Sequence, residues 1–401
     1  MDLTFNADHE TFREAARDFA KRVILPGLRE RDAKGEVDAA LYHKMGEEGF
    51  LGCSVPKRYG GLGLDYHVLA ILSEEFEYID TSARVIVSVH NGLHSCCLLQ
   101  WATEAQKQKY LAPLARGEKI ATYCLTEPAA GTDVAGIQCF AEKKGDRYVL
   151  NGEKTWISLS SVADQYLVMA YTDRDKQKKR DHSGITAFIV ERQWKGVAPY
   201  DLHGKLGVRA GVTGGVVFQD VEIPEENVLG QADDGFRVAM SALDNGRYTV
   251  AAGAVGLIRA CLDASVKYAH ERMTFQKEIG RHQLIQQMLA FMVQSRDIGD
   301  LLVRKCGWLK NTGKRCTREV ALAKWTNTVN AQLAADHAVE IHGAYGYSNE
   351  FPVERFWRNS RGAVIYEGSR EIQQIIQAEY ALGYRHDGAL RCELPPFASE
   401  D

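Results

Sequence analysis

The chain has 401 residues, of which 45% are hydrophobic and 25% are charged, and its formal net charge is −4 with a pI near 6.3. This length predicts two or three domains, and this composition predicts a large hydrophobic core. A mildly acidic chain without long runs of like charge lacks the basic footprint of proteins that bind nucleic acids or anionic membranes, so we expect neither partner.

The N-terminus reads Met-Asp-Leu-Thr-Phe and lacks a basic segment followed by an apolar core. No stretch approaches the roughly 18 uncharged apolar residues of a membrane span. We therefore expect a cytoplasmic protein without a secretion signal or a transmembrane segment. The nine cysteines contain no Cys-x-x-Cys pair, which predicts reduced, mostly buried thiols and no metal site.

Residues 1–119 are expected to form a helical domain, because apolar residues such as Phe12, Ala16 and Phe19 recur at helical spacing. Within this domain, segment 80–95 has polar residues every three or four positions in an otherwise apolar helix: Thr81, Arg84, Ser88, Asn91 and Ser95. A buried arginine needs an anionic partner. That partner is either a protein carboxylate, such as Glu75 or Glu77, or a carboxylate on a ligand.

Residues 120–234 are expected to form a β domain. Short runs of β-branched and aromatic residues, such as 148–150, 185–190 and 216–218, alternate with turn signals at Lys144-Gly145-Asp146 and Asn151-Gly152. The glycine patterns of Rossmann and phosphate-loop sites are absent, so a cofactor must be held in another way.

Residues 235–385 return to the helical period in long segments, and their small residues around 251–256 allow close helix packing. We expect a helical bundle here. Segment 386–401 contains Pro395 and Pro396 and little periodicity, and we treat it as a tail.

An acidic residue, Glu367, lies in an apolar and glycine-containing frame near the end of the bundle. Ala363, Val364 and Ile365 are expected to bury the approach to Glu367, and burial would raise the pKa of its carboxylate toward the range of a catalytic base. The alternative is an N-terminal helix acid that the helix dipole favours.

Several motifs follow one another in the order found in a known family: 59–63 (Tyr-Gly-Gly-Leu-Gly), 123–133 (Tyr-Cys-Leu-Thr-Glu-Pro-Ala-Ala-Gly-Thr-Asp), 151–158 (Asn-Gly-Glu-Lys-Thr-Trp-Ile-Ser), 243–247 (Leu-Asp-Asn-Gly-Arg), 272–275, 341–347 and 366–368 (Tyr-Glu-Gly). With these motifs the chain resembles the acyl-CoA dehydrogenase family. The resemblance implies a mainly α fold with a central β domain, made of an N-terminal α domain, a middle β domain and a C-terminal four-helix domain, usually in a homotetramer.

The resemblance also implies FAD as the cofactor and an acyl-CoA as the substrate. Glu367 would remove the α proton, its backbone N–H would hold the thioester carbonyl, and a hydride would pass from the β carbon to the flavin. Some relatives carry the base at the position that Gly246 occupies here. Because glycine has no side chain to accept a proton, the resemblance assigns the base to Glu367. The other residues expected to bind substrate are Arg84, Ser88, Thr132, Asp244, Arg247, Tyr366 and Gly368. Asp244 could instead be a helix cap, and Arg247 part of a surface ion pair.

The residues expected to bind FAD form two sets. The β-domain set is Tyr123, Leu125, Thr126, Gly131, Thr132, Trp156 and Ser158, although Trp156 taken alone would be assigned to the domain core. The C-terminal set is Arg272, Thr274, Phe275, Gln286, Glu340, Gly343, Ser369 and Glu371, and the first four match positions that reach the FAD of a neighbouring subunit. Departures from the family pattern are Gln276, His282, Glu340 and Ala344. A carboxylate at 340 would repel a pyrophosphate, so Glu340 must be turned away or paired.

The substrate hypothesis depends on Arg84 and Ser88, because Arg-x-x-x-Ser in this helix resembles members that act on carboxylated acyl-CoAs, such as glutaryl-CoA or benzylsuccinyl-CoA dehydrogenase. We expect FAD-dependent α,β-dehydrogenation of such a thioester, with an electron-transfer flavoprotein as electron acceptor. The alternatives are a short-chain monocarboxylic acyl-CoA dehydrogenase and a non-redox desulfinase or lyase on the same scaffold.

Overall fold

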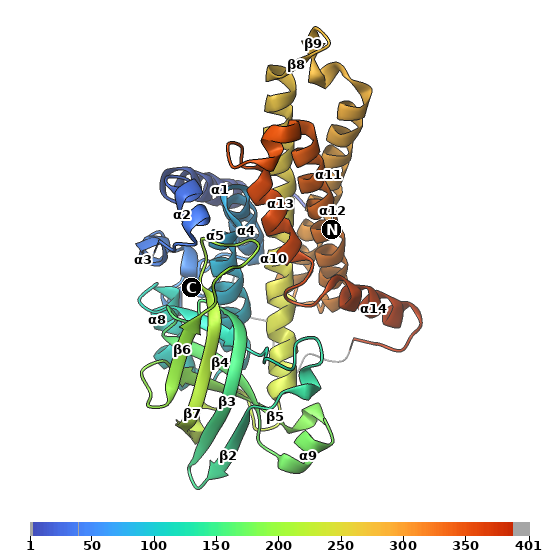
Figure 1. Ribbon diagram of the computed structural model, residues 1–401. Coiled ribbons are helices and arrows are strands. Elements are labelled where there is room, and N and C mark those ends of the chain that lie inside the picture. Colours follow the sequence, from blue (N-terminus) through green and yellow to red (C-terminus); the bar gives the residue numbers. More distant parts are fainter. Residues whose placement is uncertain (1–2, 39, 388–401) are drawn as a thin grey trace.

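The computed structural model describes residues 3–38 and 40–387, and its chain runs through helices, then strands, then helices again (Figure 1). The first α-helices are α1 (Ala7–Phe19), α2 (Leu28–Lys34), α3 (Ala40–Glu47), α4 (Tyr66–Ile79), α5 (Thr81–Ile86), α6 (Cys96–Trp101), α7 (Glu104–Gln106) and α8 (Ala112–Ala115). The change from helix to strand falls between Ala115 and Ala121. The domain boundaries at 119 and 234 stay predictions.

The segment with the polar stripe is buried, as expected, but it is not a regular α-helix. After α5 the backbone continues as a π-helix, η4 (Val87–Ser95). Because a π-turn contains more residues than an α-turn, the stripe does not keep one face. Asn91 accordingly turns toward the N-terminal helices and donates to the carbonyl of Phe50 at 2.9 Å, whereas Arg84 and Ser88 remain in contact with each other.

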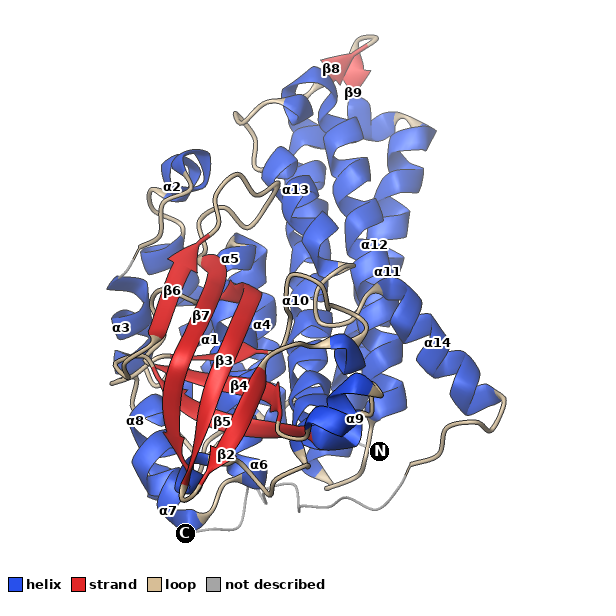
Figure 2. Ribbon diagram, turned by 60° about the horizontal axis from the view of Figure 1, so that its bottom comes forward, coloured by secondary structure: helices blue, strands red, loops and turns tan. Residues whose placement is uncertain are grey.

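The strands are β1 (Ala121–Cys124), β2 (Phe140–Lys144), β3 (Arg147–Ser158), β4 (Gln165–Tyr171), β5 (Ile185–Glu191), β6 (Val197–Asp201) and β7 (Thr213–Pro224), followed in the C-terminal part by the short pair β8 (Met273–Thr274) and β9 (Lys277–Glu278). The first seven form one sheet with the path β1-β4-β2-β3-β7-β6, and β5 pairs with β4. Strand β4 is buried along its whole length. Figure 2 shows the sheet beside the long helices α10–α12.

The turn expected at Asn151-Gly152 is wrong, because both residues lie inside β3, where the pairing with β7 shifts register between Leu150 and Gly152. A Cβ at Gly152 would lie 2.4 Å from Sγ of Cys139. The glycine therefore permits close approach of a neighbouring strand rather than a chain reversal. The other signal is correct, since Gly145 lies in the hairpin between β2 and β3.

The C-terminal part consists of α10 (Gly235–Glu271), α11 (Gln283–Asn311), α12 (Thr317–His342), α13 (Val353–Ala363) and α14 (Arg370–Ala381). Helix α10 runs from the sheet to the β8–β9 hairpin at the opposite end of the molecule (Figure 1). By length and composition α10 could cross a membrane, but 78% of its most apolar window is buried inside the protein, as in a core helix.

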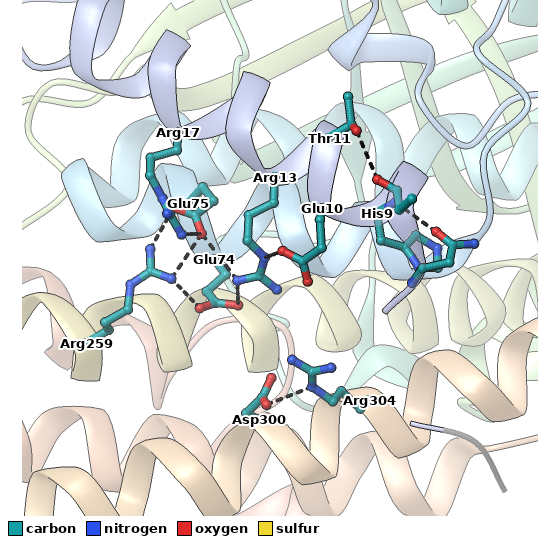
Figure 3. Close-up of polar contacts among 12 residues, drawn as sticks. His9, Glu10, Thr11, Arg13, Arg17, Glu74, Glu75, Arg259, Asp300 and Arg304 are labelled. Carbon is teal, nitrogen blue, oxygen red and sulfur yellow. Dashed lines mark hydrogen bonds and ion pairs between the residues drawn. The ribbon is translucent and has the colours of Figure 1, made fainter. Parts of the chain in front are cut away.

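A cluster of charges joins the first helix to the bundle (Figure 3). Glu75 of α4 accepts hydrogen bonds from Arg17 of α1 at 3.1 Å and from Arg259 of α10 at 2.7 Å. Arg13 of α1 lies 3.3 Å from Glu75 and 3.4 Å from Glu74. Because Glu75 is only 1% exposed, the positive charges around it are required to keep it ionised. This ionic cluster ties α1, α4 and α10 together.

The eight cysteines in the described chain are buried and form no disulfide with one another. In the same residues, no group of three or more His, Cys, Asp or Glu side chains is placed to hold a metal ion. Of the expected tail, only His386 and Asp387 belong to the described residues.

Candidate active site

Glu367 lies in the short connection between α13 and α14, and its backbone is left-handed with a φ of +53°. The N-cap of α14 is Ser369, so the alternative that Glu367 is an acid of the first helical turn is wrong. The backbone N–H of Glu367 donates no hydrogen bond to any described residue. The loop therefore presents a carboxylate and a free amide donor on one residue in a strained conformation.

The carboxylate of Glu367 lies directly over Gly246 of α10. A Cβ at position 246 would be 2.1 Å from Oε2 of Glu367 and 2.5 Å from Cδ2 of Leu93. Oε2 is buried and has no hydrogen-bond partner among the described residues. Gly246 thus provides the space that the acidic side chain occupies, and the unpartnered oxygen is free to meet a ligand.

Burial raises the pKa of Glu367 to about 7, while the positive charges of Arg84, Lys324 and Arg247 oppose this rise. A carboxylate with a pKa near neutrality is suited to accept a proton at physiological pH. Ala363 and Val364 are buried as expected, but Ile365 is 57% exposed, because it follows the end of α13 and turns toward solvent.

Side chains from three helices bind the backbone of this loop. Arg247 of α10 donates from Nε to the carbonyl of Glu367 at 3.1 Å. Lys324 of α12 and Gln373 of α14 donate to the carbonyl of Gly368 at 2.7 and 3.0 Å. Neither Lys324 nor Gln373 was predicted from the sequence. Lys324 could have been found as a single charge next to the apolar run 320–323, but no local signal distinguishes Gln373.

Arg84 is 1% exposed and lies beside the loop. Its Nε donates to Glu77 at 2.5 Å, and one terminal nitrogen donates to Oγ of Ser88 at 3.1 Å. The other terminal nitrogen donates to the hydroxyl of Tyr366, the residue before the base. Glu77 is therefore the protein carboxylate that balances the charge of Arg84. Both terminal nitrogens contact neutral hydroxyls, and within the described chain the guanidinium keeps donors for a further acceptor.

Asp244 and Arg247 lie inside α10, so Asp244 is not a helix cap. Asp244 accepts a hydrogen bond from Thr317 at 2.6 Å, and its side chain is 22% exposed. Arg247 does form an ion pair, with Asp244 at 3.6 Å, but at 6% exposure it does not lie on the surface. Arg247 thus connects Asp244 to the Glu367 loop, whose carbonyl it contacts.

Trp156 is 63% exposed and has a φ of +57°, at a point where the pairing of β3 with β7 shifts between Thr155 and Ile157. The alternative that Trp156 belongs to the domain core is therefore wrong, because the irregularity turns the indole out of the sheet. The side-chain hydroxyls of Thr126 and Ser158 make no hydrogen bond to the described protein. An exposed aromatic plane with free hydroxyls nearby fits the flat, polar-edged ring system of FAD.

A buried ion pair supports this surface. Lys154 of β3 is 0% exposed and donates to Glu127 at 2.7 Å and to the carbonyl of Leu125 at 2.9 Å. Glu127 also accepts the backbone N–H of Cys139 at 3.1 Å. The pair fixes the backbone on both sides of Thr126. Both residues belong to motifs of the sequence, but their pairing was not predicted.

The remaining β-domain residues lie around the same segment. Tyr123 and Leu125 are buried, and the hydroxyl of Tyr123 donates to the carbonyl of Ala239 at 3.3 Å. Gly131 and Thr132 are exposed, and a Cβ at Gly131 would meet nothing within 4 Å. This open loop has room for a ligand phosphate.

The C-terminal set is not brought together with the β-domain set. Arg272 and Arg247 are 25 helix positions apart along α10 and its end, which corresponds to about 37 Å. Phe275 is 90% exposed at the hairpin, Thr274 pairs with His282 at 3.1 Å, and Gln286 donates to the carbonyl of Gly280 at 3.0 Å. Residues at this end therefore lie too far away to contact a ligand that the β domain of the same chain holds.

The last expected cofactor residues lie at two places. Glu340 is exposed at the end of α12, and its orientation away from a pyrophosphate stays a prediction. Gly343 follows with a φ of +59° and space for a Cβ that would meet no atom within 4 Å. Ser369 is the N-cap of α14, and Glu371 in its first turn is exposed and pairs with Arg370 at 2.8 Å. Hydrogen bonds lower the pKa of Glu371 to about 2.

Comparisons with known proteins match most of the chain to one family. Family models for the N-terminal, middle and C-terminal domains of acyl-CoA dehydrogenases match residues 6–118, 122–221 and 233–382. The mouse mitochondrial short-chain specific acyl-CoA dehydrogenase is 38% identical over 93% of this chain and 90% of its own length. The caffeyl-CoA reductase-Etf complex subunit CarC of Acetobacterium woodii is 37% identical over 93% of this chain and 98% of its own. A glutaryl-coenzyme A dehydrogenase in complex with glutaryl-CoA has a TM-score of 0.90 at 36% identity, covering 96% of this chain and 98% of that chain.

Proposed function

We propose a substrate and residue roles from the premise that this chain belongs to the acyl-CoA dehydrogenase family, whose three domain models match it. It is accordingly an FAD-dependent oxidoreductase that dehydrogenates acyl-CoA thioesters. The substrate that we propose is a thioester whose acyl group carries a second carboxylate. The buried, unpartnered oxygen of Glu367 over Gly246 is the observation that carries the catalytic assignment.

Glu367 is the base in this proposal. Its carboxylate takes the α proton of the thioester, for which a pKa of about 7 leaves it partly ionised at neutral pH. The free N–H of Glu367 donates to the thioester carbonyl as negative charge develops there, which acidifies the α carbon. One residue thus supplies both the base and a stabilising donor, and Arg247 orients it through the Glu367 carbonyl.

FAD supplies the acceptor for the hydride that leaves the β carbon. Trp156 would lie against its ring system, and Thr126, Ser158, Tyr123 and Leu125 would contact its polar edge. Gly131 and Thr132 would meet a phosphate of the ligand or of the cofactor. The exposed indole and the free hydroxyls support these assignments.

The hairpin end of α10 would complete the FAD site of a second subunit. Arg272 can pair with a pyrophosphate there, and Phe275 is 90% exposed in the single chain, as a residue with an intermolecular contact would be. Thr274 and Gln286 belong to the same end, and Glu340 and Gly343 lie at the end of α12. Ser369 and Glu371 lie instead at the start of α14 beside Glu367, where they would contact FAD. We infer a homotetramer in which each FAD contacts two chains. Because one relative is named as part of an Etf complex, we propose an electron-transfer flavoprotein as the electron acceptor.

The acyl end would lie at Arg84. This guanidinium uses Nε for Glu77 and points its terminal nitrogens at the hydroxyls of Ser88 and Tyr366. A ligand carboxylate could displace weak neutral acceptors and form the bidentate contact that arginine favours. The solved relative in complex with glutaryl-CoA supports an acyl group of this type.

A second candidate is a short-chain monocarboxylic acyl group. Glu77 already balances the charge of Arg84, so the site does not require a second carboxylate. The mouse relative with short-chain specificity favours this candidate. A non-redox lyase on the same scaffold is the remaining alternative; the named relatives do not favour it, and it would form product without flavin reduction.

An anaerobic titration distinguishes the three candidates. Purified holoenzyme is mixed with glutaryl-CoA or butyryl-CoA, the flavin absorbance is followed, and the products are identified by mass spectrometry. Preferential bleaching by glutaryl-CoA supports the dicarboxylic proposal, whereas bleaching by butyryl-CoA alone supports the second candidate. Product without bleaching identifies a lyase.

Variants then test the role of Arg84. Arg84→Lys should raise KM for glutaryl-CoA far more than for butyryl-CoA, because lysine lacks the bidentate fork. Ser88→Ala should also raise KM for glutaryl-CoA more than for butyryl-CoA, but by a smaller factor of about tenfold. Ser82→Ala is the matched control, since Ser82 is a buried serine on the same helix that approaches Gly211 rather than Arg84. Equal losses on both substrates would refute the carboxylate site.

A further inference from the structure

Lys324 is a buried lysine that the catalytic assignments do not use. It lies on α12, its side chain is 0% exposed, and among the described residues no carboxylate lies within ion-pair distance of its ammonium group. A buried cation without a carboxylate is costly, so the hydrogen bond that it does make is informative. That bond runs from Nζ to the carbonyl of Gly368 at 2.7 Å.

The acceptor belongs to the backbone that carries the base. Glu367 and Gly368 are consecutive left-handed residues with φ of +53° and +92°. A non-glycine residue seldom adopts this conformation unless its surroundings enforce it. A second donor, Nε2 of Gln373, reaches the same carbonyl at 3.0 Å from α14. Two helices therefore converge on the peptide group between Gly368 and Ser369, one residue after the base.

We propose that Lys324 is a positioning residue for the base, which holds the left-handed backbone of Glu367 and Gly368 through the Gly368 carbonyl. This inference rests on the proposed function of Glu367. The hydrogen bond fixes the peptide plane between Gly368 and Ser369. Because Gly368 directly follows the base, this restricts the left-handed backbone that sets where the Glu367 carboxylate and its N–H point.

The charge of Lys324 has a second effect on the same residue. Burial is the main cause that lowers the pKa of Lys324 to about 7, the charges of Arg247 and Arg84 lower it further, and those of Glu367 and Glu371 raise it. In return, the ammonium opposes the rise in the pKa of Glu367. A neutral amine still donates to the Gly368 carbonyl, so the positioning contact survives at high pH, whereas the charge effect is lost.

These two effects predict different results for two variants. Lys324→Met removes both the donor and the charge in a side chain of similar shape. We expect kcat to fall about 100-fold from misplacement of the base, with KM little changed, and the midpoint of the kcat–pH profile to move upward because the carboxylate loses a positive neighbour. Gln373→Leu removes the second donor without removing a charge. It should lower kcat about tenfold with the midpoint unchanged.

A readout that needs no flavin turnover measures the base directly. Acetyl-CoA has an α carbon but no β carbon, so the holoenzyme cannot dehydrogenate it. Exchange of its α hydrogens with D₂O, followed by mass spectrometry, should slow in both variants in proportion to kcat. Thermal unfolding and the flavin-to-protein ratio are recorded for each variant as measures of folding.

The outcomes separate this inference from the proposed function. If the wild type neither exchanges α hydrogens nor reduces its flavin with any thioester, the proposed function fails. If the wild type does both, and Lys324→Met keeps its kcat and its exchange rate, or loses them only in proportion to its flavin content, the positioning role of Lys324 is wrong. Should Lys324→Met not fold, Gln373→Leu decides, because wild-type kcat and exchange in that variant would overturn the inference.

Discussion

Replacing Gly246 with alanine should displace the carboxylate of Glu367 while leaving the helix that carries the new side chain intact. Alanine is a better helix former than glycine, so the substitution stabilises the helical backbone of α10. The new Cβ, however, would lie 2.1 Å from Oε2 of Glu367, and real contacts of this type are not shorter than 3.0 Å. The carboxylate must therefore retreat by about 1 Å, a displacement that typically lowers a rate about 100-fold.

The expected result is a kcat about 100-fold lower, which corresponds to about 2.7 kcal/mol of transition-state stabilisation. The assay is single-turnover flavin reduction under anaerobic conditions with the best thioester from the substrate panel. Gly92→Ala is the matched control, since its Cβ would face the same part of α10 from η4 at an ordinary 3.4 Å from the carbonyl of Asn245. Wild-type rates in Gly246→Ala would refute the placement of the base over Gly246.

Charged side chains underlie three further predictions. The kcat should rise with pH through about 7, because only ionised Glu367 accepts a proton and burial raises its pKa to about that value against Arg84, Lys324 and Arg247; a rate that is flat across neutral pH would contradict this. Glu75→Gln should lower the free energy of unfolding in urea by about 3–5 kcal/mol, because three arginines lose a buried counter-ion. The exposed Glu118→Gln, whose partner is Arg116, should change it far less, and equal effects would argue against the ionic cluster. Arg272→Gln should lower the flavin-to-protein ratio after gel filtration while the thermal unfolding of the flavin-free chain stays unchanged, and full flavin retention would argue against a shared site.

The sequence predicted those parts of the fold that depend on the hydrophobic period and composition of a single segment. The long apolar repeats of α10–α12 and the β-branched runs of the sheet indicated their own structures, and the Tyr-Glu-Gly motif indicated Glu367. The errors came from contacts between distant segments. Asn151-Gly152 was interpreted as a turn. The glycine is required instead by the close approach of Cys139, which lies on another segment. Trp156 alone looked like core because its exposure results from a register shift between β3 and β7.

The partners of the site residues were also beyond local patterns. Glu77 was named beside Glu75 as a partner for Arg84, and only the fold decides between them, since Glu75 is taken by Arg17 and Arg259. Lys324 contacts a carbonyl 44 positions later in the chain. No periodicity within α12 contains that information.

The buried pair of Glu127 and Lys154 has a consequence for how such chains diverge. Each residue belongs to a different motif, and neither charge is tolerable in that dry interior once the other is gone. A lineage that loses the carboxylate of Glu127 must also lose the ammonium of Lys154, or pass through an intermediate that folds poorly. We therefore expect substitutions at these two positions to occur together, although 27 positions separate the two charges.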